Sequence, residues 1–137
     1  MHTSFLFMNP YAISAKTKRG EDSNENSLAR RLKDAKLGDL VIAPCNIGSH
    51  WVLLVIDVST SSVYYLDSIN SEVPLNVKIL INTAFIIFEG NKGNRKKSLA
   101  WKVVQCPKQP TNVECGFYVM MFMRDIIRDP DILSKKS

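Results

Sequence analysis

Two apolar segments joined by a short polar turn constrain the fold of this chain more than any other feature. Residues 50–58 read His-Trp-Val-Leu-Leu-Val-Ile-Asp-Val, and residues 63–67 read Val-Tyr-Tyr-Leu-Asp. The residues between them, 59–62, are Ser-Thr-Ser-Ser, so the pair predicts a β-hairpin. Because the first segment is apolar at consecutive positions, we expect it to be covered on both faces and central in a sheet.

This hairpin bears on two polar residues at its ends. His50 opens the first strand, and Asp67 closes the second. Antiparallel pairing puts the start of one strand beside the end of the other. We therefore expect an imidazole–carboxylate contact between His50 and Asp67.

The remainder of the chain supplies further elements around the hairpin. Ser27 is predicted to cap a helix, and Gly38 is predicted to stop it. The inner face of this helix is expected to comprise Leu28, Ala29, Leu32, Ala35 and Leu37. A second helix is predicted over residues 72–88. Strands are predicted over residues 39–44 and 101–106, with a strand or extended segment over residues 1–11.

The best candidate nucleophile stands at the junction of a polar loop and an apolar run. Cys115 follows a proline-bearing loop and precedes residues 117–123, which are expected to be core. With Asn112 as the N-cap, Cys115 lies in the first turn of a helix. The positive end of the helix dipole and the unpaired N–H groups there favour a thiolate.

Three other residues can serve a nucleophile at that position. A thiol nucleophile needs a base, and the base needs an orienting group. His50 and Asp67 meet these two needs through the hairpin. Gln109, in the loop before Cys115, can direct its amide N–H₂ at the group that the sulfur attacks.

The composition narrows the possible classes of protein. The chain has 137 residues, 45% of them hydrophobic and 23% charged, which is ordinary for one globular domain. A net charge of +5 favours nucleic acid only weakly as a partner. The N-terminus lacks the pattern of a signal peptide, and no apolar run approaches the roughly 20 residues of a membrane helix, so we expect no membrane association.

The cysteines argue against a metal or disulfide framework. Cys45, Cys106 and Cys115 are three in number and show no CxxC spacing. No cofactor or metal is expected, and a reducing compartment is favoured. Cys45 and Cys106 lack a nearby base in the sequence and are expected to be inert core residues.

Several short motifs, taken together, resemble the ubiquitin-like-protein-specific cysteine proteases, the SUMO-deconjugating family. These motifs are His50-Trp51 before an apolar strand, Leu66-Asp67-Ser68 after it, and Gln109 placed six positions before Cys115-Gly116. The spellings Ala43-Pro44-Cys45-Asn46 and Pro107-Lys108-Gln109-Pro110 resemble in particular the plant, transposon-associated members. The resemblance covers roughly residues 38–128 and extends more faintly over residues 5–37.

The resemblance implies a fold and a set of roles. The fold would be α+β and papain-like, with a small antiparallel sheet flanked by helices. Cys115 would attack the carbonyl after the C-terminal Gly-Gly of a SUMO-like modifier, with His50 as base and Asp67 as its orienting group. Gln109 and the Cys115 N–H would form the oxyanion hole.

Two more roles, and a departure, come from the same resemblance. Trp51 would line the tunnel for the diglycine tail, and Gly116 would let the substrate backbone approach. The family domain is normally longer, with a Trp-bearing recognition segment that has no counterpart before Phe5. Residues 1–137 are thus expected to be a single, N-terminally shortened catalytic domain. The alternative is a catalytically impaired pseudo-protease fragment that binds a ubiquitin-like protein or another partner.

Partners and location follow from the same reasoning. A ubiquitin-like modifier or its conjugates would be the partner, in the nucleus rather than the cytoplasm. The basic loop of residues 92–97 has three interpretations: a solvated loop, a contact with an acidic modifier or an import signal, or a nucleic-acid contact. The last is least favoured because the loop lacks interleaved aromatic residues.

Overall fold

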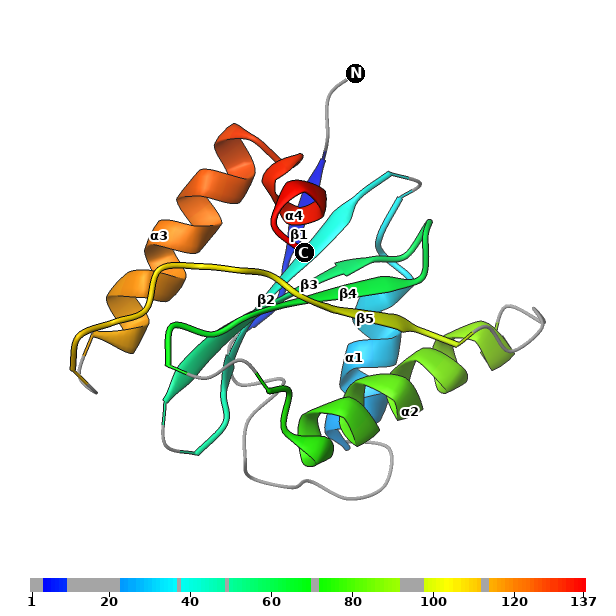
Figure 1. Ribbon diagram of the computed structural model, residues 1–137. Coiled ribbons are helices and arrows are strands. Elements are labelled where there is room, and N and C mark those ends of the chain that lie inside the picture. Colours follow the sequence, from blue (N-terminus) through cyan, green and yellow to red (C-terminus); the bar gives the residue numbers. More distant parts are fainter. Residues whose placement is uncertain are drawn as a thin grey trace.

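The computed structural model of the chain describes residues 4–9, 23–36, 38–48, 50–69, 72–91, 98–111 and 114–137. A five-stranded sheet in the order β1-β2-β3-β4-β5 forms its centre, and helices cover both faces (Figure 1). The strands are β1 (Phe5–Phe7), β2 (Leu40–Asn46), β3 (Trp51–Asp57), β4 (Ser62–Leu66) and β5 (Ala100–Val103). The helices are α1 (Asn24–Leu32), α2 (Leu75–Asn91), α3 (Cys115–Arg128) and α4 (Ile132–Lys135).

The predicted hairpin is present at the middle of the sheet. β3 pairs antiparallel with β4, from Leu53 opposite Leu66 to Asp57 opposite Ser62. In the turn, the Asp57 carboxylate accepts hydrogen bonds from the backbone N–H and the hydroxyl of Ser59. β3 is the third of five strands, and its residues 52–56 are buried, as the apolar run predicted.

The edges of the sheet differ from the expected antiparallel arrangement. β1 pairs with β2, and β5 with β4, in parallel, so the sheet is mixed. Both edge pairings follow long connections that pass through a helix, α1 between β1 and β2 and α2 between β4 and β5. Such a crossover returns the chain in its original direction, whereas a short turn reverses it. The α+β class is confirmed.

Side chains that alternate along β3 fill two separate cores. Val52, Leu54 and Ile56 face the layer of α1 and α2. Leu53 and Val55 face the opposite layer, where Val119, Phe122 and Ile126 of α3 and Leu133 of α4 pack. β3 is therefore held from both sides, and this fixes the position of its first residue.

Helix α1 begins one turn earlier than predicted. Its N-cap is Ser23, whose Oγ accepts a hydrogen bond of 3.2 Å from the Asn26 N–H, so the assignment of the cap to Ser27 was wrong. The helix ends at Leu32 with Lys33 as its C-cap, and Gly38 follows with a φ of 89°. Of the expected inner face, Leu28, Ala29 and Leu32 are buried. Ala35 is partly buried and lies beyond the end of the helix, so the predicted extension to Gly38 was wrong, and Leu37 is outside the described residues.

Helix α3 is amphipathic rather than wholly buried. It begins at Cys115 with Glu114 at the N-cap position, and the predicted cap, Asn112, lies outside the described residues. Val119 and Phe122 are buried, but Phe117 and Met120 are 63% and 60% exposed. The expectation that all of residues 117–123 are core was therefore wrong, because their periodicity leaves one face of the helix to solvent.

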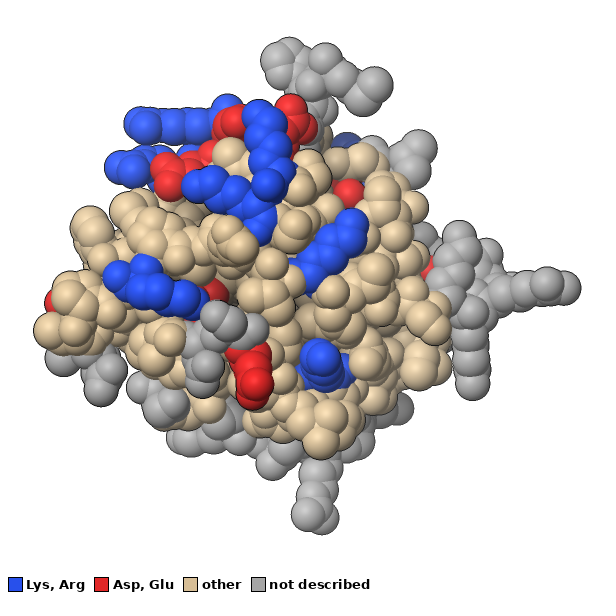
Figure 2. Space-filling view, in the orientation of Figure 1, with Lys and Arg blue, Asp and Glu red and all other residues tan. Residues whose placement is uncertain are grey.

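Charged side chains gather at the end of the molecule that carries α4 and the C-terminal part of α3 (Figure 2). Both signs are present there, and Arg124–Asp125 and Lys135–Asp129 pairs lie 3.3 and 3.7 Å apart. The basic loop of residues 92–97 falls outside the described residues. In the part of the chain that is described, no helix combines the length and apolarity needed to cross a membrane.

Candidate active site

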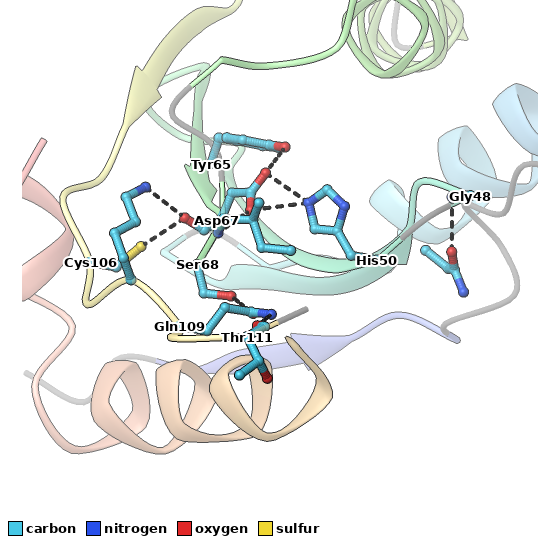
Figure 3. Close-up of polar contacts among 11 residues, drawn as sticks. Gly48, His50, Tyr65, Asp67, Ser68, Cys106, Gln109 and Thr111 are labelled. Atoms are coloured by element: carbon cyan, nitrogen blue, oxygen red, sulfur yellow. Dashed lines mark hydrogen bonds and ion pairs between the residues drawn. The ribbon is translucent and has the colours of Figure 1, made fainter. Parts of the chain in front are cut away.

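The ends of the central hairpin bring His50 and Asp67 into contact. His50 immediately precedes β3, and Asp67 immediately follows β4 (Figure 3). The His50 Nε2 atom lies 3.1 Å from Oδ1 and 3.0 Å from Oδ2 of Asp67. The two side chains are 10% and 1% exposed. The contact that the hairpin predicted is therefore present, and it is largely withdrawn from water.

The geometry assigns different tasks to the two ring nitrogens of His50. An ionised carboxylate can only accept hydrogen bonds, so a hydrogen bond between His50 and Asp67 requires the proton to be on Nε2. In the neutral ring the other nitrogen, Nδ1, then has the lone pair. A base at this position works through Nδ1.

Asp67 receives hydrogen bonds from residues on both sides of it in the chain. Its Oδ1 accepts from the Ile69 N–H at 2.8 Å, and its Oδ2 accepts from the Tyr65 hydroxyl at 2.8 Å. Its backbone oxygen accepts from the Lys108 ammonium at 3.1 Å and from the Cys106 thiol at 3.3 Å. The carboxylate is thus fixed at both oxygens.

Tyr65 is a member of this cluster that the sequence analysis missed. It is fully buried in β4, and burial together with the hydrogen bond to the Asp67 carboxylate raises its pKa well above the usual value. The hydroxyl therefore stays protonated and keeps the hydrogen that it donates to the Asp67 carboxylate. The available signal was the spacing Tyr-x-Asp, since residues two apart in a strand point to one side.

Gln109 is held beside the residue that follows Asp67. Its backbone N–H donates to the Ser68 carbonyl at 2.8 Å, and the Ser68 hydroxyl donates to its Oε1. Its Nε2 donates to the Thr111 carbonyl, at the start of the segment that leads to Cys115 (Figure 3). An amide N–H₂ has two hydrogens, so this group can serve a second acceptor.

Cys115 is the first residue of α3 and is partly exposed. The backbone N–H groups of the first helical turn lack partners within the helix, which makes this position favourable for negative charge. α3 packs against β3, the strand that His50 precedes. His50 thus contacts Asp67 directly, and Gln109 is hydrogen-bonded to Ser68. The position of Cys115 is set by the packing of its helix, α3, on β3.

The two predicted substrate contacts lie next to these residues. Trp51 is half-buried at the start of β3 and belongs, with Tyr118 of α3, to the core on the α3 side of the sheet. At Gly116, an added Cβ would meet no described atom within 4 Å. The space beside Gly116 is therefore not occupied by described parts of the chain.

The other two thiols have different surroundings. Cys45 is buried, and its burial raises the pKa of the thiol to about 12. Burial also raises the pKa of Cys106, with Lys108 acting in the opposite direction. Among the described residues, no group of three or more His, Cys, Asp or Glu side chains is arranged to hold a metal ion.

Comparison with known proteins gives a consistent match. Residues 6–134 match the family described as the Ulp1 protease family, C-terminal catalytic domain. The chain is similar to Ubiquitin-like-specific protease 1 of Saccharomyces cerevisiae, with 26% identity over a 115-residue alignment that covers 82% of this chain. The match spans 18% of that relative's length.

Solved structures share the fold. A crystal structure of a de-sumoylating protease aligns with a TM-score of 0.73 at 17% identity, covering 93% of this chain and 53% of that one. The C-terminal Ulp1 protease domain in complex with Smt3, the yeast ortholog of SUMO, aligns with a TM-score of 0.65 at 22% identity. That alignment covers 93% of this chain and 59% of the other.

Proposed function

The chain belongs to the Ulp1 protease family, and on this basis we propose that it is a cysteine peptidase that cleaves after the C-terminal Gly-Gly of a SUMO-like modifier. The observation that carries the proposal is the buried contact of His50 with Asp67 at the end of the hairpin. A histidine held by a buried carboxylate is the arrangement that a thiol nucleophile needs.

In the proposed reaction, Cys115 Sγ attacks the carbonyl carbon of the last glycine while His50 Nδ1 takes the thiol proton. The charge on the carbonyl oxygen is stabilised by the Gln109 amide and the Cys115 N–H. His50 then gives its proton to the leaving amine, and the C–N bond breaks. Water, deprotonated by His50, hydrolyses the thioester and releases the modifier and the thiol.

Asp67 would support the positive charge that His50 acquires in this reaction. Its carboxylate accepts hydrogen bonds at both oxygens, which favours its ionised form. An ionised and oriented carboxylate keeps the Nε2–H tautomer in place and stabilises the imidazolium. Trp51 and Gly116 are proposed to contact the diglycine tail.

The choice of modifier is a proposal drawn from the relatives. The Ulp1 domain among the structural neighbours was solved with Smt3 bound. Because this chain spans about half of the structural neighbours and less than a fifth of the yeast relative, the substrate surface of those proteins is not carried over as a whole. We further propose an intracellular, nuclear site of action, where a reducing environment keeps Cys115 as a thiol.

A fluorogenic substrate tests the activity directly. SUMO-like and other ubiquitin-like modifiers carrying a fluorophore amide at the C-terminal glycine are incubated with the purified chain. We expect release of the fluorophore from one of them, complete loss in Cys115→Ser, and retention in Cys45→Ala, which removes a buried thiol that has no role in the proposed reaction. Equal rates in Cys115→Ser and the parent would exclude the proposed nucleophile.

Gln109 makes a separate prediction in the same assay. Gln109→Ala removes one donor to the oxyanion, a change that costs about 10²–10³ in kcat in other acyl-transfer sites. We expect a loss of that size in kcat with little change in KM, because the donor acts on the charge that develops during the reaction. A rise in KM alone would assign Gln109 to substrate binding instead.

The competing function is the pseudo-protease module that binds a partner without cleaving it. The exposed Phe117 and Met120, close in sequence to Cys115, are the observation that favours it. A modifier that binds the chain but is never cleaved, with a Cys115→Ser variant that binds equally well, would support the module.

A further inference from the structure

One buried hydroxyl beside the proposed active site has no part in the mechanism above. The Tyr65 hydroxyl donates to Asp67 Oδ2 over 2.8 Å, and Tyr65 has no exposed surface. The same Oδ2 atom lies 3.0 Å from His50 Nε2. A donor from β4 and a donor from the residue before β3 therefore meet on one carboxylate oxygen (Figure 3).

The strand determines where this hydroxyl lies. Tyr65 belongs to the core formed with α1 and α2, beside Val63 of the same strand and Val52, Leu54 and Ile56 of β3. Asp67 follows two residues later, so both side chains leave the backbone on the same side. The ring is fixed by packing, and its hydroxyl reaches along the strand to the carboxylate.

We propose that Tyr65 is a positioning residue, whose hydroxyl holds the Asp67 carboxylate in the orientation that bonds His50 Nε2. This inference rests on the proposed function, because it concerns the same cysteine–histidine–aspartate chemistry. Tyr65 contacts neither the nucleophile nor the substrate in this scheme. It acts through Asp67.

The Ile69 N–H, which also donates to Asp67, does not replace the Tyr65 hydroxyl. The Ile69 N–H bonds Oδ1 and belongs to the bend after β4, where Ile69 is 38% exposed. Tyr65 instead bonds Oδ2 from within a strand whose residues are all buried. Without the hydroxyl, Oδ2 would lose a buried donor, which disfavours the ionised carboxylate and frees it to turn. Both effects weaken the support for a protonated His50.

The test compares Tyr65→Phe with Tyr64→Phe. Tyr64 is the neighbouring tyrosine of β4, packs on the opposite face of the sheet, and has its ring 5.4 Å from the Lys102 Nζ atom. Both variants lose one hydroxyl, but only Tyr65→Phe loses the hydrogen bond to Asp67. Each is also made in an Asp67→Asn background, and thermal unfolding verifies that the variants are folded.

Two rates are measured on every variant. The first is the rate at which chloroacetamide alkylates Cys115 at pH 7, and it is followed by peptide mass spectrometry. This rate can be measured without a ubiquitin-like modifier. The second is kcat and KM on the fluorogenic modifier. We expect Tyr65→Phe to lower the alkylation rate and kcat about tenfold and to leave KM unchanged. A tenfold change in rate corresponds to the loss of about one hydrogen bond to a charged group. Tyr64→Phe should stay within about twofold of the parent.

The Asp67→Asn background decides between positioning and general structural support. If Tyr65 acts through the carboxylate, Tyr65→Phe has no further effect once the carboxylate is gone. A parent-like rate in Tyr65→Phe, or an equal loss with and without the Asp67 carboxylate, would overturn the proposal. If Tyr65→Phe does not fold, 4-fluorophenylalanine in place of Tyr65 fills the hydroxyl's space without donating, and the same criteria apply.

Failure of the proposed function gives a different pattern. A parent chain that cleaves no modifier, but whose Cys115 alkylation slows in Tyr65→Phe and not further in the double variant, retains the Tyr65 inference while losing the peptidase. A parent chain that cleaves its modifier but is indifferent to Tyr65→Phe retains the peptidase and loses the inference.

Discussion

At the scale of single residues, the chain holds the same functional group in three environments. Cys45 is buried in β2, whereas Cys106 and Cys115 are both partly exposed. Cys106 donates a hydrogen bond to the Asp67 carbonyl, and Cys115 lies at a helix N-terminus. Burial without a compensating charge opposes thiolate formation, whereas a helix N-terminus favours negative charge. Position in the fold, and not the thiol itself, therefore decides which cysteine can react.

This difference predicts the order of thiol labelling. With its pKa at about 12, roughly one Cys45 thiol in 10⁴ is ionised at pH 8. We expect iodoacetamide at pH 8 to modify Cys115 first, Cys106 more slowly, and Cys45 only when the chain unfolds. Quantitative peptide mass spectrometry follows the three sites in one sample. Labelling of Cys45 as fast as Cys115 in the folded chain would contradict the buried position of β2.

The same thiol predicts how stability depends on pH. The pKa of Cys45 rises from 9.0 to about 12 on folding, so its contribution is complete below pH 9 and is lost as the pH rises from 9 to 12. The buried Tyr65, with its raised pKa, acts in the same direction. We expect the free energy of unfolding to fall over this range and Cys45→Ala to reduce the slope, measured by urea denaturation at several pH values. If the slope is unchanged in Cys45→Ala, the loss of stability between pH 9 and 12 does not come from the Cys45 thiol.

At the scale of secondary-structure elements, the beginning of α1 offers a direct comparison of two serines. Ser23 caps the helix through the Asn26 N–H, while Ser27, one turn later, bonds the exposed Arg30 side chain. Loss of an N-cap costs about 1 kcal/mol, and loss of an exposed contact within a helix costs less than about 0.5 kcal/mol. Ser23→Ala should therefore destabilise the chain more than Ser27→Ala in chemical denaturation. If Ser27→Ala destabilises the chain more than Ser23→Ala, Ser27 and not Ser23 is the N-cap.

The elements also separate what local sequence predicts from what it does not. The hairpin could be predicted because an apolar run, a polar turn and a second run fix the antiparallel pairing, and the His50–Asp67 contact follows from it. The cap at Ser23 was missed because the first turn of α1, Asn24–Asn26, carries no apolar residue to show its periodicity. The parallel edges depend on the paths of long crossovers, which the strand sequences do not encode.

The site was predictable to a similar extent. The motif residues could be named in order, and the hairpin placed two of them together. The hydrogen bonds of Gln109 to Ser68 and of Tyr65 to Asp67 depend on how loops and strand ends meet in space, so the sequence alone did not predict them. The exposure of Phe117 and Met120 was missed because the apolar run 117–123 is unbroken by polar residues.

At the scale of the whole molecule, the two helical layers hold the sheet from opposite sides. α1 and α2 pack on one face, and α3 and α4 on the other (Figure 1). The candidate residues come from the ends of β3 and β4, the segment after β5, and the start of α3. β3 and β4 are buried, and α3 packs on β3, so the positions of His50, Asp67 and Cys115 depend on the two-layer fold and not on one motif alone.

The central claim is that Cys115, supported by His50 and Asp67, is the nucleophile of a ubiquitin-like-modifier peptidase. The most direct test is intact-mass labelling of the folded chain with a panel of ubiquitin-like modifiers that carry a thiol-reactive C-terminus, beside Cys115→Ser. We predict one covalent adduct, mapped to Cys115, that is absent from Cys115→Ser and slowed in Asp67→Asn. A folded chain that forms no adduct with any modifier would contradict the claim and favour the binding module.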